Sequence, residues 1–434
     1  MVTEGRLDQS ALGRGGREIA FLETDRSDRD VPFTTTSEHP SGSPYRWRVL
    51  WATFFSYLID SYDLIALAIA MPVLLKVLRI SLAEGGLLGS ATMVGAMAGS
   101  VVFGLIAENY GRRFALVLSL VWLGIGMGLV YLVSTWGQWM VLRCFAGLAI
   151  GGLWGPCSAL VAQHWSHIYR ARAASFVYSS FAMGAVLAAL VGRLVLTLDW
   201  RVLFLAGAGS IPLAFIVARL IPSGNAASKH EGVRIGAILE AGLIKTTILA
   251  TLVSLCNLAG YWGVAYWIPT FLVRERGLTL SAMANFSLFM YVGMFLGFQI
   301  FGHLADRVGR RTAMMAAFLL VSFSVGVYII SHNPTFLFWW GAVVGIGVSG
   351  VAAAIGAYYA ELFPEHLRAY AGGFCWNMGR IGAVLAPYTI GYIGKIYGLE
   401  TGLAITCVIN LLGMVTLCFL PETLIKKAHG AHEV

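Results

Sequence analysis

The chain has 434 residues, of which 58% are hydrophobic and only 12% are charged. Soluble proteins carry about 25% charged residues because their surfaces face water, so this composition excludes a series of soluble domains and indicates an integral membrane protein. The net charge of +8 does not indicate a nucleic-acid partner, because most basic residues lie in short gaps between apolar segments. We therefore expect the lipid bilayer as the surroundings of this protein.

A polar stretch precedes a series of apolar segments. Residues 1–45 lack the apolar segment of a signal peptide, so we expect a disordered cytoplasmic N-terminal tail there. Crossing the hydrocarbon core of a bilayer takes about 20 helical residues, and the remaining sequence offers twelve such segments. They cover roughly 49–72, 84–107, 114–133, 138–162, 172–196, 202–221, 246–272, 281–305, 312–331, 335–361, 369–396 and 401–420.

The longest internal break divides these segments six and six. We predict an N-terminal six-helix bundle at 46–222, a cytoplasmic central loop at 223–244, a C-terminal six-helix bundle at 245–421 and a cytoplasmic C-terminal tail at 422–434. With both termini in the cytoplasm, 21 Lys and Arg residues lie inside and six lie outside. Basic residues are enriched in cytoplasmic loops, so the sequence predicts this orientation.

An internal repeat relates the two halves. GLIAENYGRR at 104–113 recurs as GHLADRVGRR at 302–311, an offset of 198, and GAVLA at 184–188 recurs at 382–386 with the same offset. A single gap-free offset through several loops and segments indicates two homologous halves. Two such halves packed around a site near the middle of the membrane form the architecture of alternating-access carriers.

The repeated G-x-x-x-[DE]-x-x-G-R-R pattern resembles the loop motif of the major facilitator superfamily. The first copy departs from it, with Glu108 for Asp and Asn109 for Arg. Two further matches are R-x-x-x-G-x-x-x-G at Arg143, Gly147 and Gly151 and E-x-x-P-x-x-x-R at Glu361, Pro364 and Arg368. The resemblance implies an all-α membrane protein with twelve transmembrane helices in two homologous six-helix bundles and both termini cytoplasmic.

Two segments resemble one branch of this superfamily more narrowly. DSYDL at 60–64 is similar to the D-G-[FY]-D of aromatic-acid:proton symporters, with Ser61 in place of the usual glycine. NMGRIGA at 377–383 is similar to their GR-x-G segment. The resemblance implies proton-coupled transport of an aromatic acid or a related metabolite.

Asp60 and Asp63 lie about halfway along the first apolar segment, on one face of the expected helix. A charge at the bilayer centre costs roughly 2.5–3.5 kcal/mol on insertion scales. Two neighbouring acids at low dielectric resist carrying two negative charges, so one of them could exchange a proton. We predict proton coupling, substrate contact or both at Asp60 and Asp63, and the family resemblance implies that Arg143 of the fourth segment assists proton transfer. The alternatives are a permanent salt bridge that orients the first helix and, for Arg143, a structural link to that helix.

Arg380 lies midway along the eleventh segment, and Asn377 and Trp376 share its helical face. A guanidinium can hold a carboxylate bidentately, an amide adds a hydrogen bond and an indole offers a flat apolar wall. At the offset of 198, neither Arg380 nor the two aspartates have a charged counterpart in the other half. We predict that Arg380, Asn377 and Trp376 bind a carboxylate. The alternative is that Arg380 pairs with an acid such as Asp60 when the site is empty.

The seventh segment carries an aromatic cluster ahead of Pro269. We predict that Tyr261 and Trp262, the deeper pair, contribute to the substrate site. The alternative is an aromatic belt at the membrane surface.

Acids, arginines and glycines gather in the loops on the expected cytoplasmic side, where they could pair with neighbouring helix ends and lock one conformation. The predicted gate residues are Gly104, Glu108, Gly111, Arg112, Arg113, Asp306, Arg307, Gly309, Arg310, Arg311, Glu361 and Arg368.

Together these features predict a monomeric, multi-pass secondary transporter of the cell membrane that imports a small organic anion, aromatic or another carboxylate, with a proton. We expect no cofactor, no metal site and no enzymatic activity, because the sequence has no nucleophile–base pair, no metal-ligand spacing and no phosphate-binding loop. A sugar or polyol symporter, a drug-efflux antiporter and a transporter-like nutrient sensor or structural membrane protein remain as alternatives.

Overall fold

A computed structural model describes residues 44–165, 167–222, 242–364 and 367–423, which contain helices and no strand. The first half contains α1 (Arg46–Val77), α2 (Leu82–Tyr110), α3 (Arg112–Gly128), the short 3-10 helix η1 (Leu129–Leu132), α4 (Trp136–His164), α5 (His167–Val195), α6 (Arg201–Gly207) and α7 (Ser210–Leu220). The second half contains α8 (Ile244–Arg274), α9 (Leu280–Val308), α10 (Arg310–Ile330), α11 (Pro334–Leu362), α12 (Arg368–Tyr397) and α13 (Leu399–Cys418). Most of the predicted tails and central loop lies outside the described residues.

Each predicted apolar segment corresponds to helix. By length and composition, 11 helical stretches of the described chain could cross a membrane, counting α3 with η1 and α6 with α7 as one each. Helix α12, at 30 residues, is long enough but is not among them, because Asn377, Arg380 and Lys395 lower its mean hydropathy.

The sixth predicted segment is broken between α6 and α7. Pro212 explains this break, because its ring would clash with the carbonyl four residues earlier in a continuous helix.

The same helix contact occurs in both halves, 198 residues apart. Helix α2 approaches α4 so closely that a methyl group on Gly95 would overlap the carbonyl oxygen of Cys144. In the second half, a methyl group on Gly293 of α9 would overlap the carbonyl oxygen of Ala342 of α11. Glycine at these positions therefore lets two long helices pack backbone against backbone, as is common in membrane bundles.

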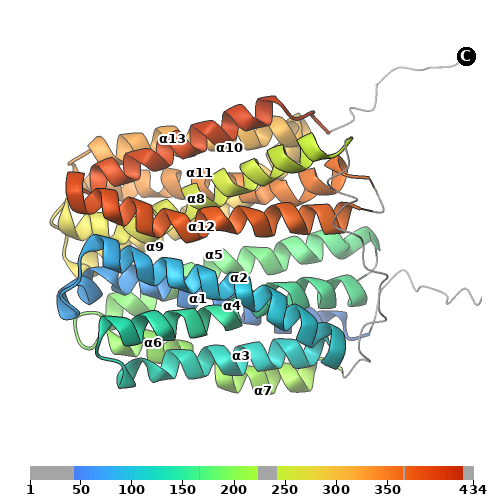
Figure 1. The fold of residues 1–434 in the computed structure, drawn as a ribbon, viewed down its shortest axis with the longest axis horizontal. Helices are drawn as coiled ribbons and strands as arrows, with labels where there is room; N and C mark the ends of the chain where they lie inside the picture. The colour runs from blue at the N-terminus through green and yellow to red at the C-terminus, as the bar shows by residue number, and fades with distance from the viewer. Residues whose placement is uncertain (1–43, 166, 223–241, 365–366, 424–434) are drawn as a thin grey trace, which may run out of the picture. The chain divides into compact units, whose positions relative to one another are not determined.

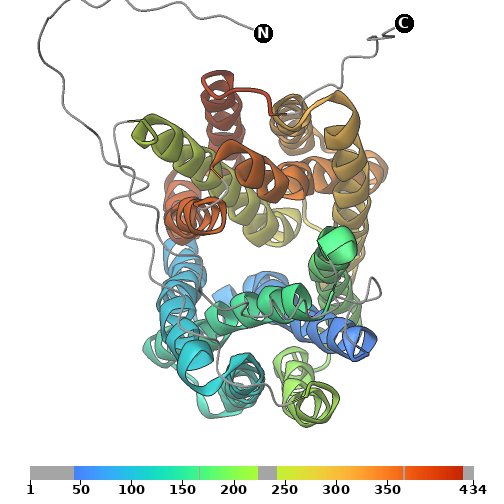
Figure 2. The ribbon, with the colours of Figure 1, turned by 90° about the vertical axis from the view of Figure 1, so that its right-hand side faces the viewer.

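Helices α1–α7 pack together, as do α8–α13, and the two sets meet along three helix pairs. These pairs are α2 with α12, α5 with α9 and α1 with α8. Figure 2, which looks along the helices, shows α2 beside α12 at one edge and α5 beside α9 at the other. Residues from both halves therefore surround the middle of the bundle.

The two halves are joined most closely at one end of the helices. We call the end at which α1 begins and α13 ends the inner end, after the orientation predicted from Lys and Arg (Figure 1). Toward the outer end, the Tyr266 hydroxyl donates to the Gly85 carbonyl at 2.8 Å, and the Ser90 hydroxyl donates to the Val384 carbonyl at 2.5 Å. At the inner end, no hydrogen bond or ion pair between described residues connects the halves.

Candidate functional site

Asp63 and Arg143 form a buried ion pair between α1 and α4. Arg143 donates from Nη1 and Nη2 to the two carboxylate oxygens of Asp63 at 2.9 and 2.8 Å, and from Nε to the Thr92 hydroxyl at 3.1 Å. Both charged side chains are almost completely buried, at 2% and 0% exposure. This geometry is the link from Arg143 to the first helix that the sequence left open as an alternative. It neutralises the charge of Asp63.

Asp60, one turn nearer the inner end of α1, has different surroundings. Its side chain is 4% exposed, and its Oδ1 atom is buried without a hydrogen-bond partner among the described residues. No described basic group lies within ion-pair distance of it. The two aspartates of this helix therefore differ, since Asp63 forms an ion pair and Asp60 does not. We call a central charge without an ion-pair partner among the described residues an open charge.

Arg380 is the second open charge in the middle of the bundle. Its Nη1 atom donates a long hydrogen bond of 3.4 Å to the Ala96 carbonyl across the interface between the halves. It interacts electrostatically with Asp60 and with the hydroxyls of Tyr57 and Tyr178, but it forms no ion pair with a described acid. The alternative in which Arg380 pairs with Asp60 in the empty site is therefore not the arrangement seen here.

The other predicted residues of α12 lie beside Arg380. The Asn377 amide donates from Nδ2 to the Gly373 carbonyl of its own helix at 3.0 Å, which leaves its side-chain oxygen available. Trp376 is partly buried and packs against two hydrophobic clusters, one with residues of both halves and one within the second half. Helix α12 thus presents a cation, an amide oxygen and an indole near the centre of the bundle.

Tyr57 of α1 and Tyr178 of α5 lie near Arg380 and pack against aromatic side chains of α4 and α9. The sequence analysis did not identify these aromatic residues. The ring of Tyr57 lies 4.9 Å from that of Trp154 and 5.8 Å from that of Tyr178, between ring centroids. Tyr178 contacts Phe298 of the other half at 5.3 Å. A signal existed only for Tyr57, which lies three positions before Asp60 and so shares its helical face.

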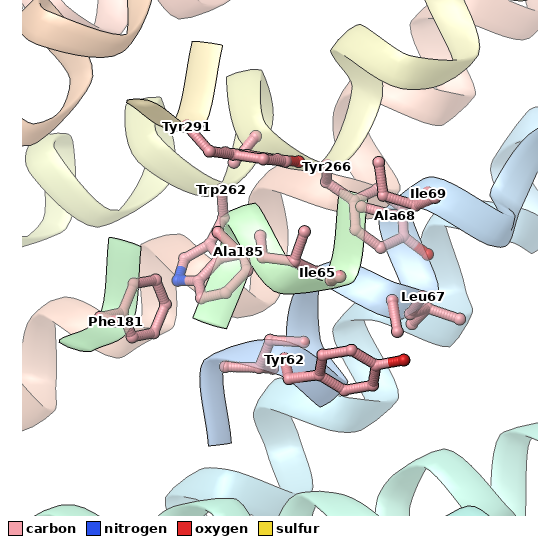
Figure 3. Packing of buried hydrophobic residues seen from close by; sticks show 14 of the residues in the cluster. Tyr62, Ile65, Leu67, Ala68, Ile69, Phe181, Ala185, Trp262, Tyr266 and Tyr291 are labelled. Carbon is pink, nitrogen blue, oxygen red and sulfur yellow. The ribbon is translucent and has the colours of Figure 1, made fainter. Parts of the chain in front are cut away.

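Tyr261 and Trp262 are buried in the contact between the halves. Their rings lie 6.1 and 6.4 Å from the ring of Phe181 of α5, and Figure 3 shows Phe181 and Trp262 in one packed cluster. Both side chains are at least nine-tenths buried. The sequence predicts that these two residues contribute to the substrate site, with an aromatic belt at the membrane surface as the alternative. Their burial between the halves agrees with the first of these interpretations.

In the first half, the predicted gate residues contact helix ends of the same half. Arg112 donates to the Ala159 carbonyl near the end of α4 at 3.1 Å, and Arg113 donates to the Ala218 carbonyl near the end of α7. Gly111 adopts a φ of 93°, which favours glycine and lets α3 begin directly after α2. Glu108 is exposed, and a methyl group on Gly104 would meet no atom within 4 Å.

In the second half, the corresponding residues form a larger cluster. Arg310 pairs with Asp306 and, at 3.3 Å, with Glu361 at the end of α11. Arg311 donates to the Leu420 carbonyl at 2.9 Å, and its backbone N–H donates to Glu422 at 3.2 Å. The remaining predicted residues are Gly309, with a φ of 113°, and the exposed Arg307 and Arg368. Their role as a gate stays a prediction.

Comparison with known proteins identifies the family. Residues 53–300 and 281–433 match the Major Facilitator Superfamily. The chain belongs to this superfamily. It is therefore a multi-pass membrane transporter and not an enzyme.

Named relatives of this transporter carry organic acids. It is 27% identical over 372 residues to the cis,cis-muconate transport protein of Acinetobacter baylyi, covering 81% of this chain and 88% of that protein. It is 24% identical over 394 residues to the benzoate transport protein of the same organism, covering 81% and 84%.

The fold is also that of solved transporters. A bacterial homolog of the human lysosomal transporter Spinster, in an inward-facing and unoccupied conformation, matches with a TM-score of 0.72 at 16% identity, covering 86% of this chain and 96% of that one. At this identity the match concerns the fold alone.

Proposed function

We propose that this transporter imports a small organic anion, an aromatic or another carboxylate, together with a proton by alternating access, with both termini in the cytoplasm. The observation that carries the proposal is the contrast between two pairs of charges in the middle of the bundle. Asp63 and Arg143 neutralise each other in a bidentate ion pair, whereas Asp60 and Arg380 lie near one another without pairing. The second pair is free to exchange partners with a substrate and a proton.

Charge balance sets the expected stoichiometry. With both pairs ionised, the four central charges sum to zero, and a bound monoanion adds one negative charge. Uncompensated charge is costly at this depth in a membrane, so one added proton restores the balance. Asp60 is the natural acceptor, because its buried Oδ1 has no hydrogen bond that protonation would break. One monoanion would therefore travel with one proton.

Arg380 and its neighbours have the chemistry to hold a carboxylate. The guanidinium fork matches two carboxylate oxygens, and Asn377 offers a further polar atom on the same face. The rings of Trp376, Tyr261 and Trp262 supply apolar walls that favour a flat, unsaturated substrate. Muconate and benzoate, the substrates by which the two relatives are named, both carry carboxylates.

The closed outer end suggests which step of the cycle this conformation represents. With the halves joined near Gly85 and Tyr266 and unconnected at the inner end, a central site would exchange with the inner side. When the inner end closes, the clusters around Arg112 and Arg310 would come within reach of the opposite half. We assign the predicted gate residues this role.

Uptake of labelled benzoate into proteoliposomes tests the proposal. An inward proton gradient is expected to drive accumulation, and a protonophore to abolish it. Arg380→Ala is expected to abolish uptake, and Arg380→Lys to weaken it because the fork is lost. Asp60→Asn is expected to lose accumulation against a gradient but to keep exchange of internal for external benzoate. Arg193→Ala, an exposed arginine of α5, is the control.

Uptake that ignores the protonophore, or that survives Arg380→Ala undiminished, would contradict the proposal. Inhibition by neutral sugars but not by carboxylates would instead favour a sugar symporter. Extrusion of benzoate from loaded vesicles in exchange for protons would favour an antiporter.

A further inference from the structure

Five buried polar side-chain atoms of the second half lack a hydrogen-bond partner among the described residues. Apart from Oγ1 of Thr270 and Nε of Arg311, they are Nδ2 of Asn257, the hydroxyl of Tyr261 and the hydroxyl of Tyr291. The three side chains are only 3%, 8% and 0% exposed. Buried polar groups are nearly always paired in native proteins, so three unpaired groups in one region require an explanation.

These groups lie on one side of the interface between the halves. Asn257 and Tyr261 are four residues apart on α8 and therefore share a helical face. Tyr291 comes from α9, and its hydroxyl interacts electrostatically with that of Tyr261. Figure 3 shows Tyr291 in the same packed cluster as Trp262. Two helices thus bring the hydroxyls of Tyr261 and Tyr291 near each other, with Asn257 on the same face of α8 as Tyr261.

A row of hydroxyls connects this region to the open charges. Tyr261 interacts electrostatically with Tyr57 and Tyr178, and both of these interact with Arg380. Ring contacts link the same residues, because Tyr57 lies 5.8 Å from Tyr178 and 5.6 Å from Phe181, and Phe181 lies 6.1 Å from Tyr261, between ring centroids. A substrate held at Arg380 by one end would extend its other end along this row.

We propose that Asn257, Tyr261 and Tyr291 form an uncharged polar subsite that binds a hydroxyl or carbonyl oxygen at the end of the substrate opposite its carboxylate. This inference rests on the function proposed above and narrows it to monocarboxylates with a neutral hydrogen-bonding group at the far end. An amide N–H and two phenolic O–H groups donate hydrogen bonds to such an oxygen. The three side chains themselves are uncharged, so they would offer a second carboxylate no counter-charge at a buried position.

Hydrophobic packing does not explain why positions 261 and 291 carry tyrosine and not phenylalanine. Tyr358, another buried tyrosine of the second half, donates from its hydroxyl to the Pro421 carbonyl at 2.7 Å. The hydroxyls of Tyr261 and Tyr291 have no such partner, so phenylalanine would fill the same space without an unpaired group. A ligand oxygen would supply the missing partner.

The test compares benzoate with 3-hydroxybenzoate and 4-hydroxybenzoate in proteoliposomes that contain the full-length protein. With labelled benzoate as the transported probe, at least one hydroxybenzoate is expected to compete roughly tenfold better than unlabelled benzoate, the gain of a buried hydrogen bond. Tyr261→Phe and Tyr291→Phe are each expected to remove most of this preference, so that benzoate and the hydroxybenzoates compete about equally. Tyr358→Phe is the matched control and should keep the preference. Thermal melting of each variant checks that it is folded.

Several outcomes would overturn the subsite. One is an unmodified transporter that does not distinguish benzoate from either hydroxybenzoate. Another is a Tyr291→Phe variant that weakens benzoate and the hydroxybenzoates equally, and a third is cis,cis-muconate, a dicarboxylate, competing better than both hydroxybenzoates. In each case Arg380-dependent benzoate uptake would persist, so the proposed function would stand. Absence of uptake of every carboxylate, with no effect of Arg380→Ala, would instead remove the proposed function and the subsite together.

Discussion

Asp63 illustrates how strongly a single buried charge can depend on its partner. Both of its oxygens accept hydrogen bonds from Arg143, and neither side chain is appreciably exposed. Such a pair contributes little net stability when formed, because both charges must be desolvated. Removing one partner is far more costly, because the other charge is left buried and uncompensated.

We therefore expect Asp63→Asn to destabilise the fold by about 3–5 kcal/mol, the range for breaking a buried ion pair from one side. Thermal unfolding of the purified protein in detergent would measure the loss. Asp60→Asn is the matched control three positions away, and we expect a smaller loss because no described group donates a hydrogen bond to Asp60. Equal melting temperatures for the two variants would contradict the distinction between a paired and an open aspartate.

The residues of the site were only partly predictable from the sequence. A charge within an apolar segment is conspicuous, so Asp60, Asp63, Arg143 and Arg380 could be selected from the sequence. Which aspartate pairs with Arg143 could not, because helical spacing puts both on one face and the pairing depends on how α4 packs. Aromatic residues such as Tyr178 escaped notice, because an aromatic side chain in an apolar segment faces lipid as readily as it faces a site.

At the scale of helices, close backbone approach requires glycine at particular positions. A methyl group on Gly293 would overlap backbone atoms of Ala342, which cannot move as freely as the end of a flexible side chain. Gly326 of α10, in contrast, has no atom within 4 Å of the position that a methyl group would occupy. The packing of α9 on α11 therefore requires glycine at position 293, whereas no neighbouring atom requires glycine at position 326.

We expect Gly293→Ala to destabilise the protein by about 1–3 kcal/mol, the usual penalty for overpacking. Gly326→Ala should be neutral or should stabilise by up to about 1 kcal/mol, because alanine favours helix more than glycine does. Melting temperatures of the two variants in the same detergent would compare them. If Gly326→Ala were the more damaging change, the assigned packing of α9 on α11 would be wrong.

Helices were more predictable than the site, since a run of about 20 apolar residues is a strong signal for a membrane span. The sequence located the segments but did not anticipate the break between α6 and α7. Pro212 carried the signal, but a membrane helix often tolerates proline within a continuous span. In helix α12, the polar residues that could bind a substrate also lower the mean hydropathy, so composition alone does not mark this helix as a membrane span.

For the whole molecule, the conformation could not be predicted from the sequence. Any alternating carrier uses the same helices in each of its states, so apolar segments and loop charges do not select one. What distinguishes the states is packing between the halves. Here Gly86 of α2 lies against the backbone of Pro387 of α12, in the same outer region as the bond from Tyr266 to Gly85.

A side chain at position 86 should therefore open the outer end. A Cβ atom there would overlap the backbone of Pro387, so this conformation cannot accommodate Gly86→Leu without separating α2 from α12. A change that disfavours one of two states shifts the population toward the other. We expect the variant to populate a state open at the outer end and to lose net uptake.

Thiol labelling can detect this shift. Ser90→Cys, in a background whose six native cysteines are replaced, places a reporter that is 93% buried at the same contact, because Ser90 itself is 7% exposed. We expect an impermeant maleimide to label this cysteine faster in intact cells when Gly86→Leu is present. Gly137→Leu, at the start of α4 with open space around it, is the control and should leave labelling unchanged. Equal labelling in both variants, with transport intact, would mean that the approach of α2 to α12 does not hold the outer end closed.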